Sequence, residues 1–329
     1  MNTMDILKTS LERRGLISRT LFLGESKKSF TQFSVPGSQH MVTFSTESPL
    51  YPFTSSSARL IANFKNFAYD LASLIDVSFP DSVTIYAQEL AFEKAEILLK
   101  KHGLVIVKPN SSSVSNGLTL NIRTVETLHN AIKFARNYSQ EVLVQRQVSG
   151  DEIRFTVIDG KVRAAILRLT PGVVGDGKQS LKQLIASENS ARSLIVDTAV
   201  PYPAIDSALV DLDSFDLDVI PGDGERIELG KGTMIRLGAS IYDIVDAVDP
   251  TYSKIAEKLA AQLGRGFVVV DIMIQDYKQP ADDHNYAFIE FNLTPALQLF
   301  YSCRDGKHFD VVENYLAPMI AEVLQKESK

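Results

Sequence analysis

The chain of 329 residues has few of the side chains that build disulfides and metal clusters: one cysteine and five histidines. The single Cys303 cannot form an internal disulfide, which fits a reducing compartment, and no nucleophile signature surrounds it. The histidines are scattered along the sequence. A zinc site or a histidine-based catalytic triad therefore has little support, and each histidine is better interpreted as a surface or packing residue.

Long apolar runs and an excess of positive charge are also missing. No apolar stretch approaches the roughly 20 residues that span a bilayer, and no charged-then-apolar segment at the start is typical of an export signal. A net charge of −6 argues against broad binding to nucleic acid or anionic membranes, although a local basic groove for phosphates is compatible with it. We expect a cytoplasmic protein with no nucleic-acid and no membrane partner.

Several common catalytic motifs are absent as well. The sequence has no Gly-x4-Gly-Lys-Ser/Thr loop, no Gly-x-Gly-x-x-Gly after a strand, no Gly-x-Ser-x-Gly elbow and no His-Glu-x-x-His. The chemistries that depend on these motifs can be set aside. Hydrophobic and charged contents of 45% and 22% are ordinary for a globular protein, and the length predicts two or three subdomains.

The pattern of apolar residues predicts mixed helices and strands. The first sixty or so residues show short strand-like pieces separated by turns, and helices are expected near 58–74 and 87–101. Residues 104–145 then predict strand, loop, strand, helix and strand, which makes a compact α+β unit. Asp159-Gly160 predicts a hairpin turn between two alternating strands. Further helices are expected at 180–187, 250–263 and 310–325.

Two apolar runs near the C-terminus carry acidic or amide side chains where a buried strand is normally hydrophobic. Glu290 and Asn292 lie two residues apart and share a strand face, which Asp271 could join from a neighbouring strand. Unpaired buried carboxylates are costly, so a cation must compensate them or the strands must end in a wet cleft. Oxygen ligands of this kind suit magnesium. Salt bridges to Lys or Arg are an equally good interpretation of these runs.

Two basic residues sit where an anion could be bound. Lys108 ends a predicted buried strand and meets a Ser/Gly loop whose backbone N–H groups could hold the same anion. The alternative is a lysine that extends from a strand end to solvent. Arg154 shares a strand face with Glu152 and could hold a phosphate or carboxylate with two hydrogen bonds. A surface ion pair is the simpler alternative.

The order of these features resembles the ATP-grasp superfamily over roughly residues 63–316. The ATP-grasp portions of bifunctional glutathione synthetases and cyanophycin synthetases are most similar. They share a Val-Val-Gly-Asp-Gly segment like the one in Arg168–Lys178, an Asp-x-x-Asp pair like Asp243 and Asp246, and a run like Ile289-Glu-Phe-Asn292. The resemblance implies an α+β ATP-grasp fold, with two α+β subdomains gripping ATP and a small N-terminal domain. The implied boundaries are 1–62, 63–150 and 151–329.

The resemblance also implies a role for each matching position. Lys65 and Lys108 would contact the ATP phosphates, Glu152 the ribose hydroxyls, and Arg154 the γ-phosphate or acyl-phosphate. The adenine hinge would be formed by Gln145, Arg146, Gln147 and Val148. The mobile phosphate-covering loop would include Ser112, Ser113, Asn116 and Gly117. One or two Mg²⁺ ions, or Mn²⁺ in their place, would be bound by Asp271, Glu290 and Asn292.

Some positions depart from the family pattern. The phosphate-covering loop has one glycine, Gly117, where relatives usually have more, and Gln145-Arg146 replaces an acidic pair in the hinge. The segment Gly232–Gly238 replaces an Asn/Ser-rich segment near the acceptor substrate. Its Arg236 is a candidate for binding a substrate carboxylate, or it pairs with Asp243 or Asp246.

The resulting hypothesis is an ATP- and Mg²⁺-dependent carboxylate–amine ligase that forms an amide or peptide bond through an acyl-phosphate. Arg154, Lys108 and Arg236 are the candidate catalytic residues. The partners would be ATP, a carboxylate donor and an amine acceptor, each an amino acid or small peptide, and a homodimer is left open. The alternatives are a ligase that tailors a peptide natural product and a nucleotide-binding pseudoenzyme that regulates a partner.

Overall fold

The computed structural model divides by its internal contacts into two units. Unit 1 comprises Met1–Pro52, Arg163–Asp246 and Thr294–Lys329, and unit 2 comprises Phe53–Val162 and Ala247–Leu293. The structure describes residues 3–22, 24, 29–45, 54–88, 92–112, 116–195, 200–230, 232–264, 266–294, 296–304 and 311–328. The division into three domains at residues 1–62, 63–150 and 151–329 stays a prediction, because the two units do not test it.

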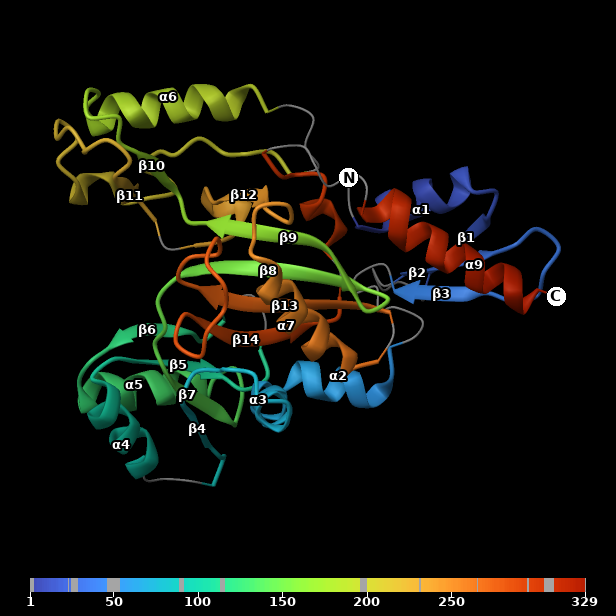
Figure 1. Ribbon diagram of the computed structural model, residues 1–329, viewed down its shortest axis with the longest axis horizontal. Helices are drawn as coiled ribbons and strands as arrows, with labels where there is room; N and C mark the ends of the chain where they lie inside the picture. The colour runs from blue at the N-terminus through green and yellow to red at the C-terminus, as the bar shows by residue number, and fades with distance from the viewer. Residues whose placement is uncertain are drawn as a thin grey trace. The chain divides into compact units, whose positions relative to one another are not determined.

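Unit 2 contains strands from two antiparallel sheets and the helices that pack on them (Figure 1). Its helices are α2 Ser56–Asn63, α3 Lys65–Leu74, α4 Glu93–His102, α5 Val125–Ala135 and α7 Pro250–Ala261. Its strands are β4 Ser82–Ile85, β5 Val105–Pro109, β6 Thr119–Ile122, β7 Val142–Arg146, β8 Asp151–Ile158, β13 Phe267–Ile274 and β14 Tyr286–Asn292. One sheet has the order β4-β7-β5-β6, and in the other β13 lies between β8 and β14.

The sheet β4-β7-β5-β6 has two chemically different faces because successive side chains of a strand alternate. The face toward α4 and α5 is made largely of four buried valines, Val105, Val107, Val142 and Val144. The opposite face of β5 and β7 carries Ile106, Lys108, Leu143 and Gln145. The apolar face holds the sheet to its helices, and the other face presents a lysine and a glutamine.

The start of α3 is set by a distant residue. Asn110 accepts hydrogen bonds from the backbone N–H of Lys65 through its backbone oxygen (3.2 Å) and from that of Asn66 through Oδ1 (3.0 Å). Phe64 is extended, with φ −116° and ψ 110°, and separates α2 from α3. The predicted single helix at 58–74 is therefore two helices, and the break places Lys65 at the first position of α3.

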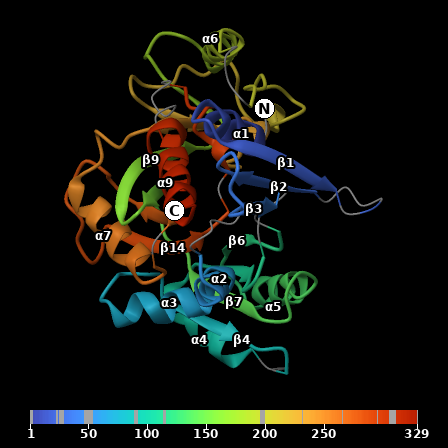
Figure 2. The same cartoon turned by 90° about the vertical axis from the view of Figure 1, so that its right-hand side faces the viewer.

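Unit 1 combines helices, short strands and 3-10 turns, and α1 and α9 pack against each other in both views (Figure 2). Its α-helices are α1 Thr3–Arg13, α6 Leu181–Ser193 and α9 Ala317–Glu327, and η4 Val312–Leu316 is a π-helical turn. Its 3-10 turns are η1 Leu212–Ser214, η2 Ile235–Leu237 and η3 Leu297–Leu299. Its strands are β1 Ile17–Phe22, β2 Ser29–Ser34, β3 Val42–Ser45, β9 Lys161–Leu169, β10 Gly172–Val174, β11 Arg226–Glu228 and β12 Ser240–Asp243.

The strands of unit 1 pair as β1-β2-β3, as β10 with β11 and as β12 with β9. Arg13, the last residue of α1, and Arg14, which follows it, form ion pairs with Glu313 of η4 at 2.9 and 2.7 Å. These pairs tie the first helix to the turn before the last one. Within the described residues, no helix is both long and apolar enough to cross a bilayer.

The structure agrees with some of the elements predicted from the sequence and corrects others. Asp159 and Gly160 have φ of 48° and 76°, which confirms the predicted turn. The expectation of only strand-like pieces near the N-terminus is wrong, because Thr3–Arg13 is helical. Met4, Leu7 and Leu11 recur at helical spacing there and are buried. The predicted helix at 87–101 begins later, at Glu93.

Gly150→Ala tests the close approach of the start of β8 to the end of β13. Gly150 has a φ of +129°, and an added Cβ would lie 2.4 Å from the backbone oxygen of Ile274. We expect the variant to lose about 3 kcal/mol of unfolding free energy, because the backbone must shift in addition to being strained. Urea denaturation measures the loss.

Gly160→Ala is the matched control. Gly160 also has a positive φ, +76°, but an added Cβ would meet no atom within 4 Å. This variant should lose about 1–2 kcal/mol of unfolding free energy, because only the backbone conformation is strained. Equal losses in the two variants would show that the contact with Ile274 is unimportant.

Candidate functional site

Charged side chains form a row across strands β8, β13 and β14 of unit 2. The register pairs Arg154 with Asp271 and Asp271 with Glu290, so the three side chains share one face. Glu152 precedes Arg154 by two residues and Asn292 follows Glu290 by two, so both extend the same face. Five polar residues of the candidate site therefore lie on adjacent strands.

The centre of the row is a buried ion pair. Arg154 donates from Nε to Oδ1 of Asp271 at 2.8 Å and from Nη2 to Oδ2 at 2.6 Å, which engages both carboxylate oxygens. The Asp271 side chain is 2% exposed and that of Arg154 14%. Burial lowers the pKa of Arg154, but Asp271 outweighs burial and raises that pKa above its ordinary value. The Arg154 guanidinium therefore stays charged, and the two hydrogen bonds fix its orientation.

Lys65 connects Glu290 to the loop that follows β5. Its Nζ lies 3.3 Å from Oε2 of Glu290 and donates to the backbone oxygen of Ser112 at 3.1 Å. Lys65 is the first residue of α3 and is buried, whereas the side chain of Glu290 is about one-third exposed. One ammonium group thus holds both the strand carboxylate and the start of the loop.

Tyr69 is the centre of a second set of contacts. Its hydroxyl donates to the backbone oxygen of Ile289 at 2.9 Å and accepts from Nζ of Lys108 at 3.2 Å and from Nε2 of Gln145 at 3.0 Å. Burial raises the pKa of Tyr69 well above its ordinary value, so the hydroxyl keeps its proton. The only proton is used on Ile289, so Gln145 must face Tyr69 with its amide NH₂ group.

This orientation leaves the other end of the Gln145 amide without a partner. Its Oε1 is buried and accepts no hydrogen bond from any described residue. A buried acceptor in this state costs about 1–3 kcal/mol. The oxygen belongs to the polar face of the β5–β7 sheet, beside Lys108. The site therefore contains an acceptor that is suited to a ligand N–H group.

Lys108 is the most strongly perturbed base of the site. Burial lowers its pKa to about 8, although Glu290 and Glu152 act in the opposite direction. The ammonium group is therefore still mostly charged at neutral pH, at a buried position that is 8% exposed. A buried cation of this kind is suited to meet an anion.

Known proteins share both sequence and fold with this chain. Residues 76–171 match the family model described as D-ala D-ala ligase C-terminus. The chain is 27% identical over 228 residues to the glutathione biosynthesis bifunctional protein GshAB of Streptococcus agalactiae, covering 67% of this chain and 30% of that protein. GshAB of Streptococcus thermophilus is also 27% identical, over 76% of this chain and 34% of its own length. The chain spans about a third of the relatives that it matches.

Two solved structures show the same architecture. A bifunctional glutathione synthetase from Pasteurella multocida superposes with a TM-score of 0.60 at 21% identity, over 98% of this chain and 43% of that one. A D-alanine–D-alanine ligase from Bacillus anthracis gives 0.50 at 16% identity, over 84% and 71%. The chain has the ATP-grasp fold. The predicted fold class and the resemblance to bifunctional glutathione synthetases are confirmed.

Most of the predicted site residues of this ATP-grasp fold lie in unit 2. The network described above joins Lys65, Lys108, Gln145, Arg154, Asp271 and Glu290. In the predicted hinge, Arg146 is exposed, and Gln147 exchanges hydrogen bonds with Asn121 at 2.8 and 2.9 Å. Val148 follows β7 in an irregular segment and is half-buried.

The predicted phosphate-covering loop is described in part. Ser112 donates from Oγ to the backbone oxygen of Asn116 at 2.9 Å, which links the described residues on either side of the loop. Gly117 has a φ of +75°, and a Cβ there would lie 2.7 Å from Pro109, so glycine is required. Ser113 lies outside the described residues. Local packing thus explains why residue 117 is a glycine. The role of the loop in covering the phosphates stays a prediction.

The structure describes the surroundings of the predicted metal ligands and of Arg236 but does not test their roles. Asp271 and Glu290 form ion pairs with Arg154 and Lys65, the alternative left open by the sequence. No group of three Asp, Glu, His or Cys side chains among the described residues is arranged to hold a metal ion. Arg236 belongs to unit 1, is exposed, and contacts the sulfur of Met234 at 3.6 Å. Both its catalytic role and the metal site stay predictions.

The sequence reasoning missed Tyr69. It lies within the predicted helix at 58–74 and follows Lys65 by four residues, so the two residues share a helix face. That spacing was the available signal. Its hydroxyl contacts with Lys108 and Gln145 depend on three separate elements, and no local pattern predicts them.

Asp271→Asn tests the buried pair. The change leaves the Arg154 guanidinium buried without a full counter-charge, so we expect a loss of about 3–5 kcal/mol in unfolding free energy. The double variant Arg154→Met with Asp271→Leu removes both charges and should recover most of that loss. Denaturant titrations compare the three proteins, and a double variant no more stable than Asp271→Asn would refute the ion-pair account.

The pKa of Lys108 predicts a pH dependence of stability. Because the folded pKa of about 8 lies below the ordinary value of 10.5, the unfolded chain binds more protons between these values. Unfolding free energy should therefore rise as the pH increases from about 8 toward 10.5. Urea titrations across this range should show the rise in the wild type and a smaller one in Lys108→Met. Identical slopes in the two proteins would contradict the depressed pKa.

Proposed function

We propose that the chain is an ATP- and Mg²⁺-dependent carboxylate–amine ligase that joins amino acid or small peptide substrates through an acyl-phosphate. The observation that carries this proposal is the continuous polar network of unit 2, from Lys108 and Tyr69 to Lys65, Glu290 and the Arg154–Asp271 pair. The named relatives, a glutathione biosynthesis protein and D-alanine–D-alanine ligases, support the reaction class.

The charge of the network supports a nucleotide that arrives with metal. Three cations, Lys65, Lys108 and Arg154, are balanced by three carboxylates, Glu152, Asp271 and Glu290, which leaves no net charge. A triphosphate would make this group strongly negative unless a divalent cation accompanied it. The residues therefore fit a metal–nucleotide complex better than a free nucleotide.

The oxygen donors fit Mg²⁺ unequally. Glu290 and Asn292 share a strand face and Glu290 is partly exposed, so these two residues would hold the ion. Asp271 could join them through the second lone pair of an oxygen that already accepts a hydrogen bond from Arg154. We assign Asp271 a double role, as the residue that orients Arg154 and as an additional ligand. Mn²⁺ would occupy the same donors.

The polar face of the β5–β7 sheet fits the nucleotide. Lys108 would contact the phosphates and the base, and the unpartnered Oε1 of Gln145 would accept from the amino group of adenine. Backbone groups of Arg146, Gln147 and Val148 would complete the base contacts, and Glu152 the ribose contacts. Ser112, Ser113, Asn116 and Gly117 would cover the phosphates, held at their start by Lys65.

The chemistry requires positioning and electrostatics but no nucleophilic side chain. A substrate carboxylate oxygen attacks the γ-phosphorus of ATP, ADP leaves, and an acyl-phosphate forms. An amine then attacks the acyl carbon and phosphate leaves with the bonding electrons, which yields the amide. Arg154 and the two lysines would stabilise negative charge in both steps, and a cation held by Glu290 and Asn292 would supply further neutralisation of the phosphate charge. Arg236 would hold a substrate carboxylate.

One observation favours a second candidate, a nucleotide-binding protein without ligase activity that regulates a partner. The Asp271 carboxylate is fully engaged by Arg154, as it would be in a protein that does not use it for metal. The remaining inferences, a cytoplasmic location, a homodimer and the domain boundaries at 62 and 150, rest on the sequence and on family resemblance.

Phosphate release distinguishes these candidates. The purified chain is incubated with ATP, Mg²⁺ and a panel of amino acids and dipeptides, and the products are examined by mass spectrometry. We expect release that depends on one pair of substrates, and a product whose mass equals the sum of the two substrates minus one water. ATP binding without substrate-stimulated release from any member would favour the regulatory protein.

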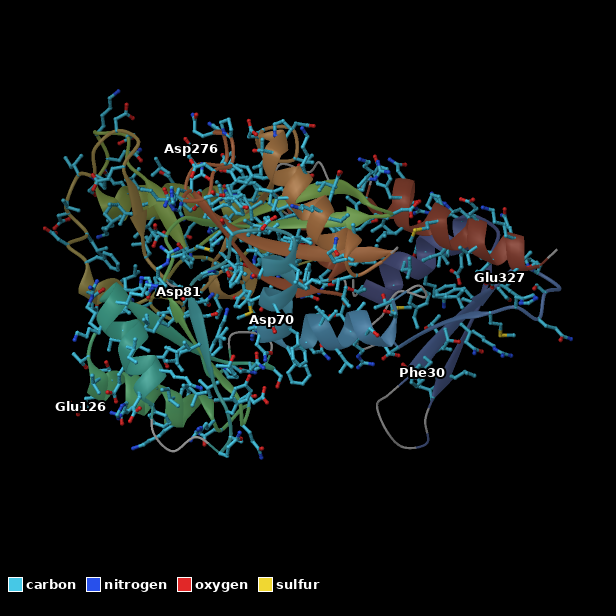
Figure 3. All side chains as sticks on the ribbon, turned by 60° about the horizontal axis from the view of Figure 1, so that its bottom comes forward. Phe30, Asp70, Asp81, Glu126, Asp276 and Glu327 are labelled. Atoms are coloured by element: carbon cyan, nitrogen blue, oxygen red, sulfur yellow. The ribbon has the colours of Figure 1, made fainter. Side chains whose placement is uncertain are left out.

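Glu290→Gln tests the metal assignment within this assay. The change keeps the size of the side chain and removes the charge that binds the cation, so we expect turnover to fall by at least about a hundredfold. Because Glu290 pairs with Lys65 but is one-third exposed, the unfolding midpoint should fall by less than that of Asp271→Asn. The control is Glu126→Gln, at an exposed position on α5 (Figure 3), which should retain full activity. Wild-type turnover in Glu290→Gln would remove Glu290 from the metal site.

A further inference from the structure

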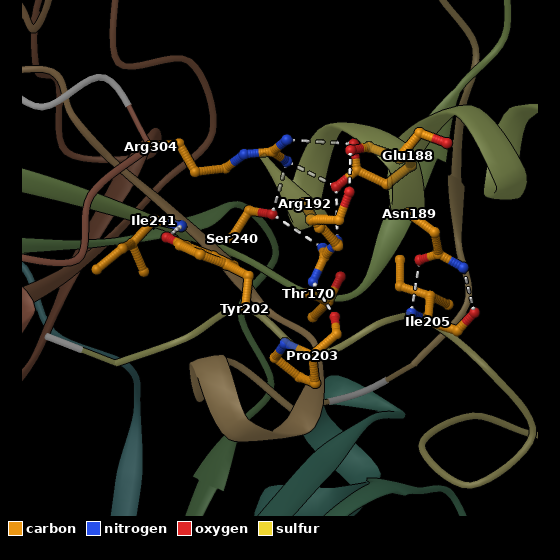
Figure 4. A network of polar contacts seen from close by, with 12 residues as sticks. Thr170, Glu188, Asn189, Arg192, Tyr202, Pro203, Ile205, Ser240, Ile241 and Arg304 are labelled. Carbon is orange, nitrogen blue, oxygen red and sulfur yellow. Dashed lines mark hydrogen bonds and ion pairs between the residues drawn. The ribbon is translucent and has the colours of Figure 1, made fainter. Parts of the chain in front are cut away.

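In unit 1, two arginines share one carboxylate (Figure 4). Glu188 and Arg192 lie one turn apart on α6, and Arg304 follows η3. Oε1 of Glu188 accepts from Nε of Arg192 at 2.7 Å and from Nη1 of Arg304 at 2.6 Å, and Oε2 accepts from Nη2 of Arg304 at 3.4 Å. The side chain of Glu188 is 19% exposed, that of Arg192 1% and that of Arg304 14%.

The cluster carries one positive charge in excess. Two guanidinium groups face one carboxylate, and neither arginine forms an ion pair with a second acid among the described residues. Burying an uncompensated charge is costly, so an additional anion would be bound favourably. The cost is smallest for Arg304, whose side chain keeps some exposure.

The two arginines differ in what they leave free. Arg192 uses all three nitrogens: Nε on Glu188, Nη1 on the backbone oxygen of Pro203 at 3.2 Å, and Nη2 on Oγ of Ser240 at 3.1 Å. Arg304 uses only its two Nη atoms, on Glu188 and on Ser240. Its Nε–H and one Nη2–H have no partner in the described part of the chain.

Those two N–H groups form one edge of a planar guanidinium. They point in parallel at the spacing of two carboxylate oxygens, which is the geometry of bidentate recognition. Lysine could not provide this edge.

The edge is held in place from several sides. The rings of Tyr202 and Tyr242 lie 5.8 and 5.9 Å from the guanidinium carbon of Arg304. The hydroxyl of Tyr202 donates to the backbone oxygen of Ser302 at 2.6 Å. The backbone N–H of Arg304 donates to the backbone oxygen of Ile241 at 2.9 Å. A donor pair fixed in this way loses little conformational freedom when it binds a ligand.

We propose that the free Nε/Nη2 edge of Arg304 binds the carboxylate of an amino acid or peptide substrate. This inference rests on the proposed ligase function and narrows it: one substrate keeps a free carboxylate that is recognised here and is not activated. Glu188 holds the Arg304 guanidinium in position, and Arg192, whose nitrogens are all engaged within the cluster, makes no contact with the ligand.

A matched pair of variants tests the proposal. Arg304→Gln and Arg192→Gln each remove one positive charge and each leave one arginine paired with Glu188. Only Arg304→Gln removes the free edge, whereas Arg192→Gln also removes the hydrogen bonds to Pro203 and Ser240. Binding is measured by calorimetry for a panel of amino acids and dipeptides and for the carboxamide of each. The wild type should bind at least one free acid about tenfold or more tighter than its carboxamide.

Arg304→Gln should abolish this preference, and Arg192→Gln should keep it within about threefold, since its lost charge acts only at a distance. Arg304→Lys, which keeps the charge without the fork, should lose most of the preference. Unfolding midpoints of the three variants report any loss of fold.

Three results would overturn the proposal: a wild type with no preference for any free acid, equal losses in Arg304→Gln and Arg192→Gln, or an unchanged preference in Arg304→Gln. In each case the cluster is a structural ion triad. A wild type that shows the preference but releases no phosphate from ATP would instead contradict the ligase function and leave the carboxylate site standing.

Discussion

The candidate site depends on the bidentate ion pair between Arg154 and Asp271. It joins β8 to β13 at the middle of the polar row, and both side chains are nearly buried. Ions in this position are stable only when hydrogen-bonded to each other, so the pair fixes the direction of the guanidinium. Glu290 belongs to the same row but remains partly exposed, and Lys65 is its partner.

A second constraint comes from the limited number of protons on Tyr69. One hydroxyl serves a backbone carbonyl, a lysine and an amide, and this sharing decides which end of Gln145 is left unpaired. The same polar face holds Lys108, whose pKa of about 8 reflects its burial. Polar groups that are buried without complete pairing reduce stability, so their presence on one sheet face is most simply explained by a ligand that completes them.

The sequence indicated the strands of the site better than the contacts within it. Alternation predicted that Glu290 and Asn292 share a face, and the register agrees. Pattern alone could not decide whether the carboxylates meet metal or arginine, because that depends on which residue lies opposite. The N-terminal helix and the break at Phe64 were missed, the second because Asn110, far away in the sequence, caps α3.

The sequence by itself indicated mixed helices and strands and the identity of the charged residues, because alternation and helix spacing are local properties of the chain. The ATP-grasp fold came from the resemblance of its ordered motifs to that superfamily. Only the tertiary structure decided how those charges are paired. It placed Asp271 against Arg154, Lys65 against Glu290, and Arg304 with one edge free. Partners in an ion pair come from elements far apart in sequence, and their choice follows from register and packing, which no local pattern contains.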